Sequence, residues 1–331
     1  REIGERRRLD PHREVGDVCP VRRAMAAIVI RVVWLHVAGT KSSWRAVRLE
    51  AEAAGPGVIP IEAHAGGGAT SDGQLHAVIF NADELEIIRG TPEHRRKFLD
   101  AGIVGIYPPF VRTLTDYNRV IKQKNALLQS AQENNFSVEK TGELLEIWNE
   151  QLVGLATRIN KARLRYVERL QEVLEKKLFG KEEISIRYAS SLEGKGDLSD
   201  YAALLTERLK LRVQAELANG HALLGTHRDD LEILFDGRDL RAFGSSGQQR
   251  SALLLLQLAN LSVYHTQHNE YPLFLLDDVD AELDYKRIGQ LLGFLSDKTQ
   301  TFVTTSKESF IERFGDKAKV FTVVEGKGES Q

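Results

Sequence analysis

The sequence predicts an α/β fold with a parallel sheet and an inserted antiparallel helical arm. Three observations predict it. The run "LFLLDDVDAELD", 273–284, takes four apolar residues directly into two aspartates, as a buried strand does at the edge of a parallel sheet. Two long segments upstream have helical apolar spacing, and strand and helix patterns alternate downstream. A carboxylate pair at a strand end is a common setting for a Mg²⁺-nucleotide.

Composition limits the classes of protein that the chain can belong to. It has 331 residues, is 42% hydrophobic and 28% charged, and carries a net charge of -2. That balance gives no global electrostatic attraction to nucleic acid. The single cysteine, Cys19, excludes a disulfide framework and a cysteine-built zinc site. No apolar run approaches the ~20 residues of a membrane span, so we expect a cytoplasmic protein without a membrane partner.

Composition changes near residue 75. The first 78 residues contain no Phe or Tyr, and ten arginines against the single Lys41. We therefore set residues 1–74 apart as an atypical segment that is disordered or out of frame, and the opening Arg suggests a fragment. Residues 75–108 are then the remnant of one lobe of the head.

Residues 109–182 are predicted to form the helical arm. From Pro109 to about Ser130 apolar residues fall on one face of a helix. After the turn signal "ENNFS", a second helix begins near Ser137 and ends at Gly180. Its apolar seam alternates steps of three and four through Leu145, Trp148, Leu152, Leu155, Ile159, Ala162 and Tyr166.

Residues 183–331 are predicted to return to the head. "ISIRYASSL" reads as a strand, and a helix should run from about Leu198 to Ala218. A hairpin through "DGRD" follows. The last elements are a strand at 271–277, a helix after Asp284 and a strand at 301–305.

Two motifs in this part carry chemistry. In "FGSSGQQRSALLLL", from Phe243, small residues open a long apolar helix, and its free N–H groups make that end an anion site. About two dozen residues later comes the strand that ends in Asp277 and Asp278. This order is that of an ABC-type ATPase, a signature helix followed by a Walker B strand. Asp277 would then hold Mg²⁺ through water, and Asp278 would act catalytically by polarising the attacking water.

Three segments resemble the RecF family, which is related to SMC-type ABC ATPases. "GTHRDDLEILFDGRDLRAFGSSGQQR" resembles the family's "GPHRDD" segment and signature helix, with Thr226 where proline is usual. "LLDDVDAELDYKR" resembles its Walker B and D-loop, and "ADELEIIRGTPEHRRKFLD" a further segment, with Ala82 in place of proline. The match covers roughly three quarters of the chain, in the family's order, so the fold class is an ABC/SMC-type P-loop NTPase head.

The resemblance also implies site residues. A partner protomer's ATP would meet the signature residues Ser245, Ser246, Gly247, Gln248 and Gln249. Glu282 and Asp284 fall in the D-loop at the dimer interface. Thr304 and Thr305 occupy the switch position where many ABC ATPases place histidine. Arg95, Arg96 and Lys97 are candidates for DNA contact by charge alone, and a solvated helix face is the plainer interpretation.

One family motif is missing. No GxxxxGK[ST] occurs in the sequence. "VAGTKSSW" holds glycine, lysine and serine, but Thr40 separates Gly39 from Lys41 and the first glycine is absent. The loop must wrap phosphates with consecutive N–H groups, so its spacing is fixed. We therefore expect this chain to be deficient in ATP binding.

The resemblance implies a DNA repair and recombination mediator. Such a protein binds ATP and Mg²⁺, is a weak ATPase, forms an ATP-dependent homodimer and binds DNA at single-strand/duplex junctions. It works with RecR and RecO in gap repair, replication restart and the SOS response. The alternatives are a non-enzymatic coiled-coil adaptor or a fragment of another SMC-like ATPase. The arm, at about seventy residues, is short for the latter.

Overall fold

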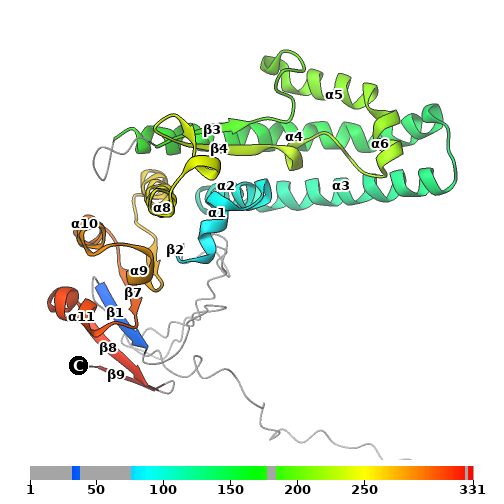
Figure 1. Cartoon of the computed structure of the whole chain (residues 1–331). Coiled ribbons are helices and arrows are strands. Elements are labelled where there is room, and N and C mark those ends of the chain that lie inside the picture. Colours follow the sequence, from blue (N-terminus) through cyan, green and yellow to red (C-terminus); the bar gives the residue numbers. More distant parts are fainter. Residues whose placement is uncertain (1–31, 38–75, 177–183, 325–326, 331) are drawn as a thin grey trace, which may run out of the picture.

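The computed structural model describes residues 32–37, 76–176, 184–324 and 327–330. These residues form a head built on a parallel sheet and a long helical arm that projects from it (Figure 1). None of the helices in these ranges has a stretch that is long and apolar enough to cross a bilayer.

The head contains a six-stranded sheet in the order β2-β6-β7-β1-β8-β9. Every neighbouring pair is parallel except β8 with β9. The carboxyl ends of the five parallel strands therefore share one edge, where ligands bind in open α/β sheets. The strands are β1 Val32–Val37, β2 Ala77–Phe80, β6 Leu273–Leu276, β7 Thr301–Thr305, β8 Lys319–Val324 and β9 Lys327–Ser330.

Strand β1 comes from the atypical N-terminal segment. It pairs with β7 on one side and β8 on the other, so it lies inside the sheet. The rest of residues 1–74 lies outside the described residues, and the prediction that this segment is disordered or out of frame stays a prediction.

Helix α8, Ser246–His268, connects the head to the arm. It packs against β2 on one side and against the arm on the other. Thirteen of its residues are buried, which explains why its sequence is apolar on nearly all sides. The other helices of the head are α1 Glu86–Arg89, α2 Pro92–Ile106, α7 Leu240–Phe243, α9 Val279–Glu282, α10 Tyr285–Leu295 and α11 Glu308–Phe314.

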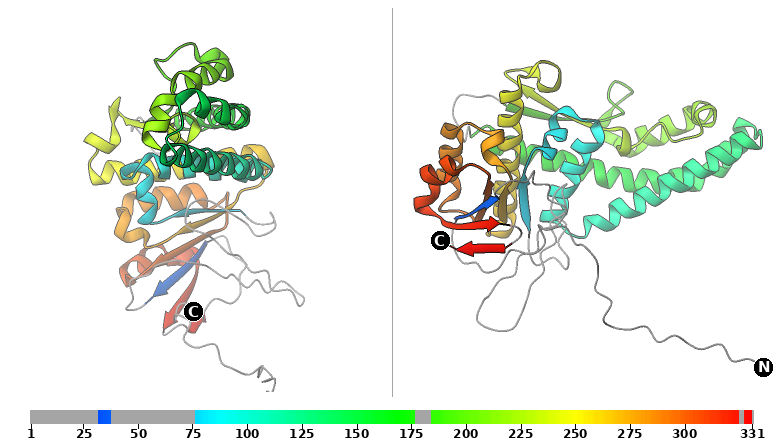
Figure 2. Two further views of the ribbon diagram at one scale, coloured as in Figure 1. Left: turned by 90° about the vertical axis from the view of Figure 1, so that its right-hand side faces the viewer. Right: turned by 60° about the horizontal axis from the view of Figure 1, so that its bottom comes forward.

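The arm contains the predicted pair of antiparallel helices. Helix α3, Phe110–Glu133, and helix α4, Val138–Leu174, lie side by side along its whole length (Figures 1 and 2). Helix α4 begins where predicted, and Ser137 caps it by accepting a hydrogen bond from Lys140 N. Helix α4 ends at Leu174, earlier than predicted, and Gly180 lies outside the described residues.

The predicted seam is buried. Its members Leu145, Leu152, Ile159 and Tyr166 are at most 1% exposed. Leu145 packs with Leu128 of α3 in a small cluster of the arm, whereas the other three belong to the main core, against which Trp148, Leu155 and Ala162 are partly buried.

The segment after the arm differs from the sequence prediction in one place. Strand β3, Ile184–Ala189, is present as predicted, but the single helix expected over 198–218 is broken at Arg212. The break gives α5, Tyr201–Leu211, and α6, Val213–Asn219, and both pack on α4. Strands β4, Asp230–Phe235, and β5, Arg238–Asp239, form the predicted hairpin.

A buried ion pair fastens α6 to the arm. Lys124 Nζ on α3 lies 2.7 Å from Glu216 Oε2 on α6, and both side chains are 0% exposed. Lys124 also donates to Asn149 on α4 at 2.8 Å, and Glu216 Oε1 accepts from Leu223 N. Burial lowers the pKa of Lys124, and Glu216 opposes that shift.

Lys124→Met should destabilise the arm, because it leaves the Glu216 carboxylate buried without its cation. We expect the free energy of unfolding to fall by about 3–5 kcal/mol in urea denaturation followed by circular dichroism. Lys124→Met with Glu216→Gln should recover most of the loss, since the amide still accepts from Leu223 N. A double variant as unstable as the single one would show that the charge pair is not the cause.

Candidate functional site

Two aspartates lie at the carboxyl edge of the parallel sheet, directly after β6. Asp277 is 8% exposed, and its backbone N donates to Phe80 O on β2, which continues the ladder by one residue. Asp278 follows with φ 49° and ψ 44°, a left-handed conformation that ends the strand. The predicted Walker B carboxylates are therefore at the edge where a nucleotide site is expected.

Thr304, on the neighbouring strand β7, fixes both aspartates. Its hydroxyl donates to Asp277 Oδ1 at 2.6 Å and accepts from Asp278 N at 2.9 Å. Thr304 is 6% exposed, and Thr305 is 2% exposed, with a hydroxyl that accepts from Lys307 N. The predicted switch residues thus lie beside the carboxylates, but their hydroxyls are engaged within the chain. Thr304 positions Asp277 and Asp278.

Charged residues surround Asp278. Lys307 pairs with Asp280 at 3.0 Å and also donates to the Asp280 carbonyl. Burial raises the pKa of Asp278, and Asp280 and Glu282 add to the rise, while Lys307 opposes it. A carboxyl that ionises less readily than usual is better able to exchange a proton with water.

The N-terminus of α8 presents the predicted signature residues. Ser245 and Gln248 form a capping box: Gln248 N donates to Ser245 Oγ, and Ser245 N donates to Gln248 Oε1. Ser245, Ser246 and Gly247 are exposed. Open space surrounds the position of a Cβ on Gly247, so this surface is accessible to a partner.

Gln249 differs from the other signature residues. It is 7% exposed, accepts from Arg89 Nε at 2.6 Å and donates to Leu240 O. Its side chain holds α8 against α1 and α7. The prediction that Gln249 contacts a nucleotide conflicts with this geometry, because its amide is directed into the protein.

Two arginines link the signature helix to the predicted D-loop. Arg250 on α8 pairs with Glu282 at 2.8 Å, and Glu282 is 11% exposed. Arg287 on α10 lies 3.6 Å from Asp284 and donates weakly to Gly247 O at 3.4 Å. Neither arginine was predicted from the sequence, although Arg250 directly follows the signature and Arg287 lies three residues after Asp284.

The segments "TPEHRRKFLD" and "GTHRDD" bind one another. Arg95 donates to both carboxylate oxygens of Asp230, at 2.7 and 2.9 Å, and to Gly90 O. Arg96 donates to Asp229 O at 2.7 Å. Arg95 is 4% exposed, so neither a DNA contact nor a solvated helix face describes it. Of the three predicted basic candidates only Lys97 is exposed, and it pairs with Glu93.

A second contact ties the same region to the arm. Arg163 on α4 donates to both oxygens of Asp100 on α2, each at 2.8 Å, and to Thr226 O. Gly225 before it has φ 129°, and a Cβ there would lie 2.5 Å from Tyr117 Oη. Glycine is therefore required at this position. We call these two ion pairs, Arg163 with Asp100 and Arg95 with Asp230, the ionic clasp.

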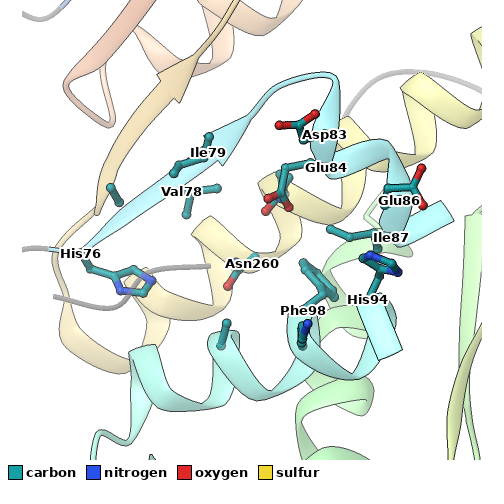
Figure 3. Close-up of a pocket in the computed structure, with 14 residues that line it drawn as sticks. His76, Val78, Ile79, Asp83, Glu84, Glu86, Ile87, His94, Phe98 and Asn260 are labelled. Atoms are coloured by element: carbon teal, nitrogen blue, oxygen red, sulfur yellow. The ribbon is translucent and has the colours of Figure 1, made fainter. Parts of the chain in front are cut away.

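A separate pocket of about 330 Å³ lies between β2, α1, α2 and α8 (Figure 3). His76 and Asn260 line one end, and Asp83, Glu86 and His94 lie at the other. His76 stacks on Tyr264 at 4.6 Å, and burial lowers its pKa to about 4. The pocket is lined by different residues from those of the carboxylate edge, so it is not part of the predicted nucleotide site.

The residues present fit Mg²⁺ only in part. Among the described residues no group of three or more His, Cys, Asp or Glu side chains gathers to hold a metal. Mg²⁺ in nucleotide sites is typically bound by one or two carboxylates together with phosphates and water. Asp277, whose Oδ1 accepts from Thr304, would hold through water an ion that a nucleotide brings.

The comparisons with known proteins agree with the geometry. No family model matches the chain. A Cyanothece protein named "DNA replication and repair protein RecF" is 38% identical over 240 residues, which cover 71% of this chain and 63% of that protein. A Lysinibacillus sphaericus protein of the same name is 35% identical, over 77% of this chain and 70% of its own length.

A solved structure is similar over the same region. "Structure of the recombination mediator protein RecF-ATP in RecFOR pathway" matches with a TM-score of 0.68 and 32% identity, over 78% of this chain and 68% of that chain. This chain spans less than two thirds of the length of the Cyanothece relative.

The parallel sheet, the carboxylate pair, the signature helix and the inserted arm define an ABC/SMC-type ATPase head. The chain belongs to the RecF family of DNA replication and repair proteins.

Asp278→Asn should stabilise the fold more at neutral than at acidic pH. Because the pKa of Asp278 is raised in the folded chain, the folded state binds this proton more tightly. That stabilisation is complete below the unfolded pKa of about 3.9 and is lost as pH rises through the folded pKa. The gain from the amide should therefore grow from pH 4 to pH 7.5 in urea unfolding.

Asp236→Asn is the matched control, because Asp236 is exposed and has the same left-handed backbone, φ 47°. Asparagine tolerates that conformation better than most residues, so any stabilisation that comes from the backbone should be the same in both variants. The growth with pH is expected of the Asp278 variant, whose carboxyl lies beside Asp280 and Glu282. Parallel pH profiles for the two variants would contradict the assigned environment of Asp278.

Proposed function

We propose that this chain acts in DNA repair as a RecF-type recombination mediator that binds DNA at single-strand/duplex junctions. The observation that carries the proposal is the joint placement of the carboxylate pair, the exposed signature N-terminus and the arm in one RecF-like fold. The role covers gap repair and replication restart, with a connection to the SOS response. RecR and RecO are the proposed partners, since a similar solved structure is named for the RecFOR pathway.

In the proposed parent mechanism two protomers enclose two nucleotides. Ser245, Ser246, Gly247 and Gln248 of one protomer meet the phosphates held by the other. The exposure of Ser245, Ser246 and Gly247 supports this role, and so does the helix dipole. The capping box engages the N–H groups of Ser245 and Gln248, which leaves those of Ser246 and Gly247 for phosphate. Asp277 would hold Mg²⁺ through water, and the ion would supply charge neutralisation at the phosphates. Asp278 orients water, and Thr304 holds both carboxylates in place.

We further propose that this chain binds ATP poorly. Asp277 and Asp278 repel a triphosphate, and the attraction in such sites comes from a loop of N–H groups with a lysine. Strand β1 ends at Val37, and its carboxyl end lies at the same edge of the sheet as Asp277, two strands away. The sequence that follows β1 is Ala-Gly-Thr-Lys-Ser-Ser, which lacks the required spacing.

A second candidate function is a nucleotide-independent adaptor with a structural carboxylate pair. The missing GxxxxGK[ST] favours it. Nucleotide and DNA binding distinguish the two functions.

The DNA proposal predicts that the purified chain binds a gapped duplex several-fold more tightly than a blunt duplex of equal length. Fluorescence anisotropy at 50 mM salt measures both, and low salt is needed because phosphate contacts weaken steeply with salt. Equal, negligible anisotropy changes with both DNAs would contradict the mediator role and favour the adaptor.

The ATP proposal predicts no heat of binding when Mg-ATP is titrated into the chain at concentrations that detect micromolar affinity. Binding at one site per chain would contradict the deficiency. Lys41→Ala then locates the site: loss of that binding would assign the phosphates to the sequence after β1, and unchanged binding would assign them elsewhere.

A further inference from the structure

The outward face of α4 carries a row of four cations. Arg158, Lys161, Arg165 and Arg169 follow one another at steps of three, four and four residues. At 3.6 residues per turn these steps keep all four on one side of the helix. All four are exposed, and they are together called the cationic face of α4.

The packing of α4 confirms which way this face points. Ile159, Tyr166 and Leu170, from the opposite side of the same turns, are at most 1% exposed and belong to the core. Arg163 lies on that inner side, where Asp100 neutralises it. The same stretch of helix therefore has one arginine that serves the fold and four cations that face solvent.

The cationic face is not satisfied within the described part of the chain. There, no ion pair joins Arg158, Lys161 or Arg165 to a carboxylate. Arg169 makes a 3.4 Å contact with Gln267. Glu168 and Glu172 follow Arg165 and Arg169 by three residues, yet neither forms an ion pair with them. By contrast, Arg187 on the exposed side of β3 is paired with two glutamates.

Stability does not account for this arrangement. Like charges one helical turn apart destabilise a helix by about 0.2–0.5 kcal/mol for each pair. Glu168 and Glu172 lie along the same side of the helix, so four cations and two carboxylates leave this side with two net positive charges in a chain whose net charge is -2. An external anion would relieve the repulsion.

We propose that the cationic face of α4 binds the phosphate backbone of DNA, so that the arm lies along one strand. This rests on the proposed role in DNA repair and assigns a surface to it. From Arg158 to Arg169 the helix rises about 16 Å, at ~1.5 Å per residue. One strand of duplex DNA presents about five phosphates over that length, at ~3.4 Å each.

DNA fits this face better than an acidic protein does. Three of the four cations are arginines, whose planar guanidinium binds phosphate with two parallel hydrogen bonds. A row of cations about 16 Å long matches the continuous, evenly spaced phosphates of a DNA strand. The contact carries no base recognition, so it sets affinity and orientation without sequence preference.

The test neutralises three cations, Arg158→Gln, Lys161→Gln and Arg165→Gln, in the full chain. Anisotropy with labelled gapped duplex is measured from 25 to 200 mM salt. We expect about a 10-fold or greater loss of affinity at 50 mM, and a salt slope smaller by about 2.7, which is 0.9 for each lost duplex contact. Unchanged circular dichroism shows that the variant is folded.

The matched control neutralises three exposed cations of the same arm, Arg112→Gln, Arg119→Gln and Lys122→Gln on α3. It changes the net charge equally and should keep the affinity within about 2-fold. If the wild type binds and both triple variants bind equally well, the surface is wrong while the DNA role stands. If the wild type does not bind DNA at all, the proposed DNA role and the proposed surface are both wrong. Equal competition by polyglutamate at equal charge would also overturn the assignment to DNA.

Discussion

The ionic clasp is the interaction on which the arrangement of arm and head depends. Arg163 reaches from the arm to Asp100, and Arg95 reaches from the same helix as Asp100 to Asp230 at the start of β4. Both arginines are about 5% exposed, so each carboxylate neutralises a charge that the core could not otherwise hold. Helix α2 is therefore bound on both sides, and arm, hairpin and head are joined through it.

At the edge of the sheet, the positions of Asp277 and Asp278 depend on a polar contact from the neighbouring strand. One hydroxyl, that of Thr304, fixes the Asp277 carboxylate and the backbone of Asp278. The D-loop is held to the signature helix through Arg250 and Glu282. The signature residues and the predicted D-loop are thus in contact within one chain. On the other side of α8, Tyr166 of α4 donates to Asn260, which joins the arm to the same helix.

The sequence predicted what periodicity and strand-end position control. The seam of α4, its start at Ser137 and the aspartates after β6 are local patterns, and the structure has them where expected. Long-range pairing was not predictable: Arg95 looked solvated because Asp230 is 135 residues away. The burial of Lys124 could have been predicted, because Lys124 falls on the same helix face as the buried Tyr117, Val120 and Leu128. A cation on such a face needs a buried partner of opposite charge. Gln249 and Thr304 were assigned by resemblance to a family. Such a resemblance predicts where a residue lies in the fold but not where its side chain points.

Hydrogen–deuterium exchange of Asp100→Asn compared with the wild type tests the role of the clasp most directly. The change preserves shape but leaves Arg163 buried without its counter-charge, a loss of about 3–5 kcal/mol. The account predicts that amides of α2, the middle of α4 and residues 225–230 lose protection together, because they open as one unit. Faster exchange confined to α2, with α4 and 225–230 unchanged, would contradict the account.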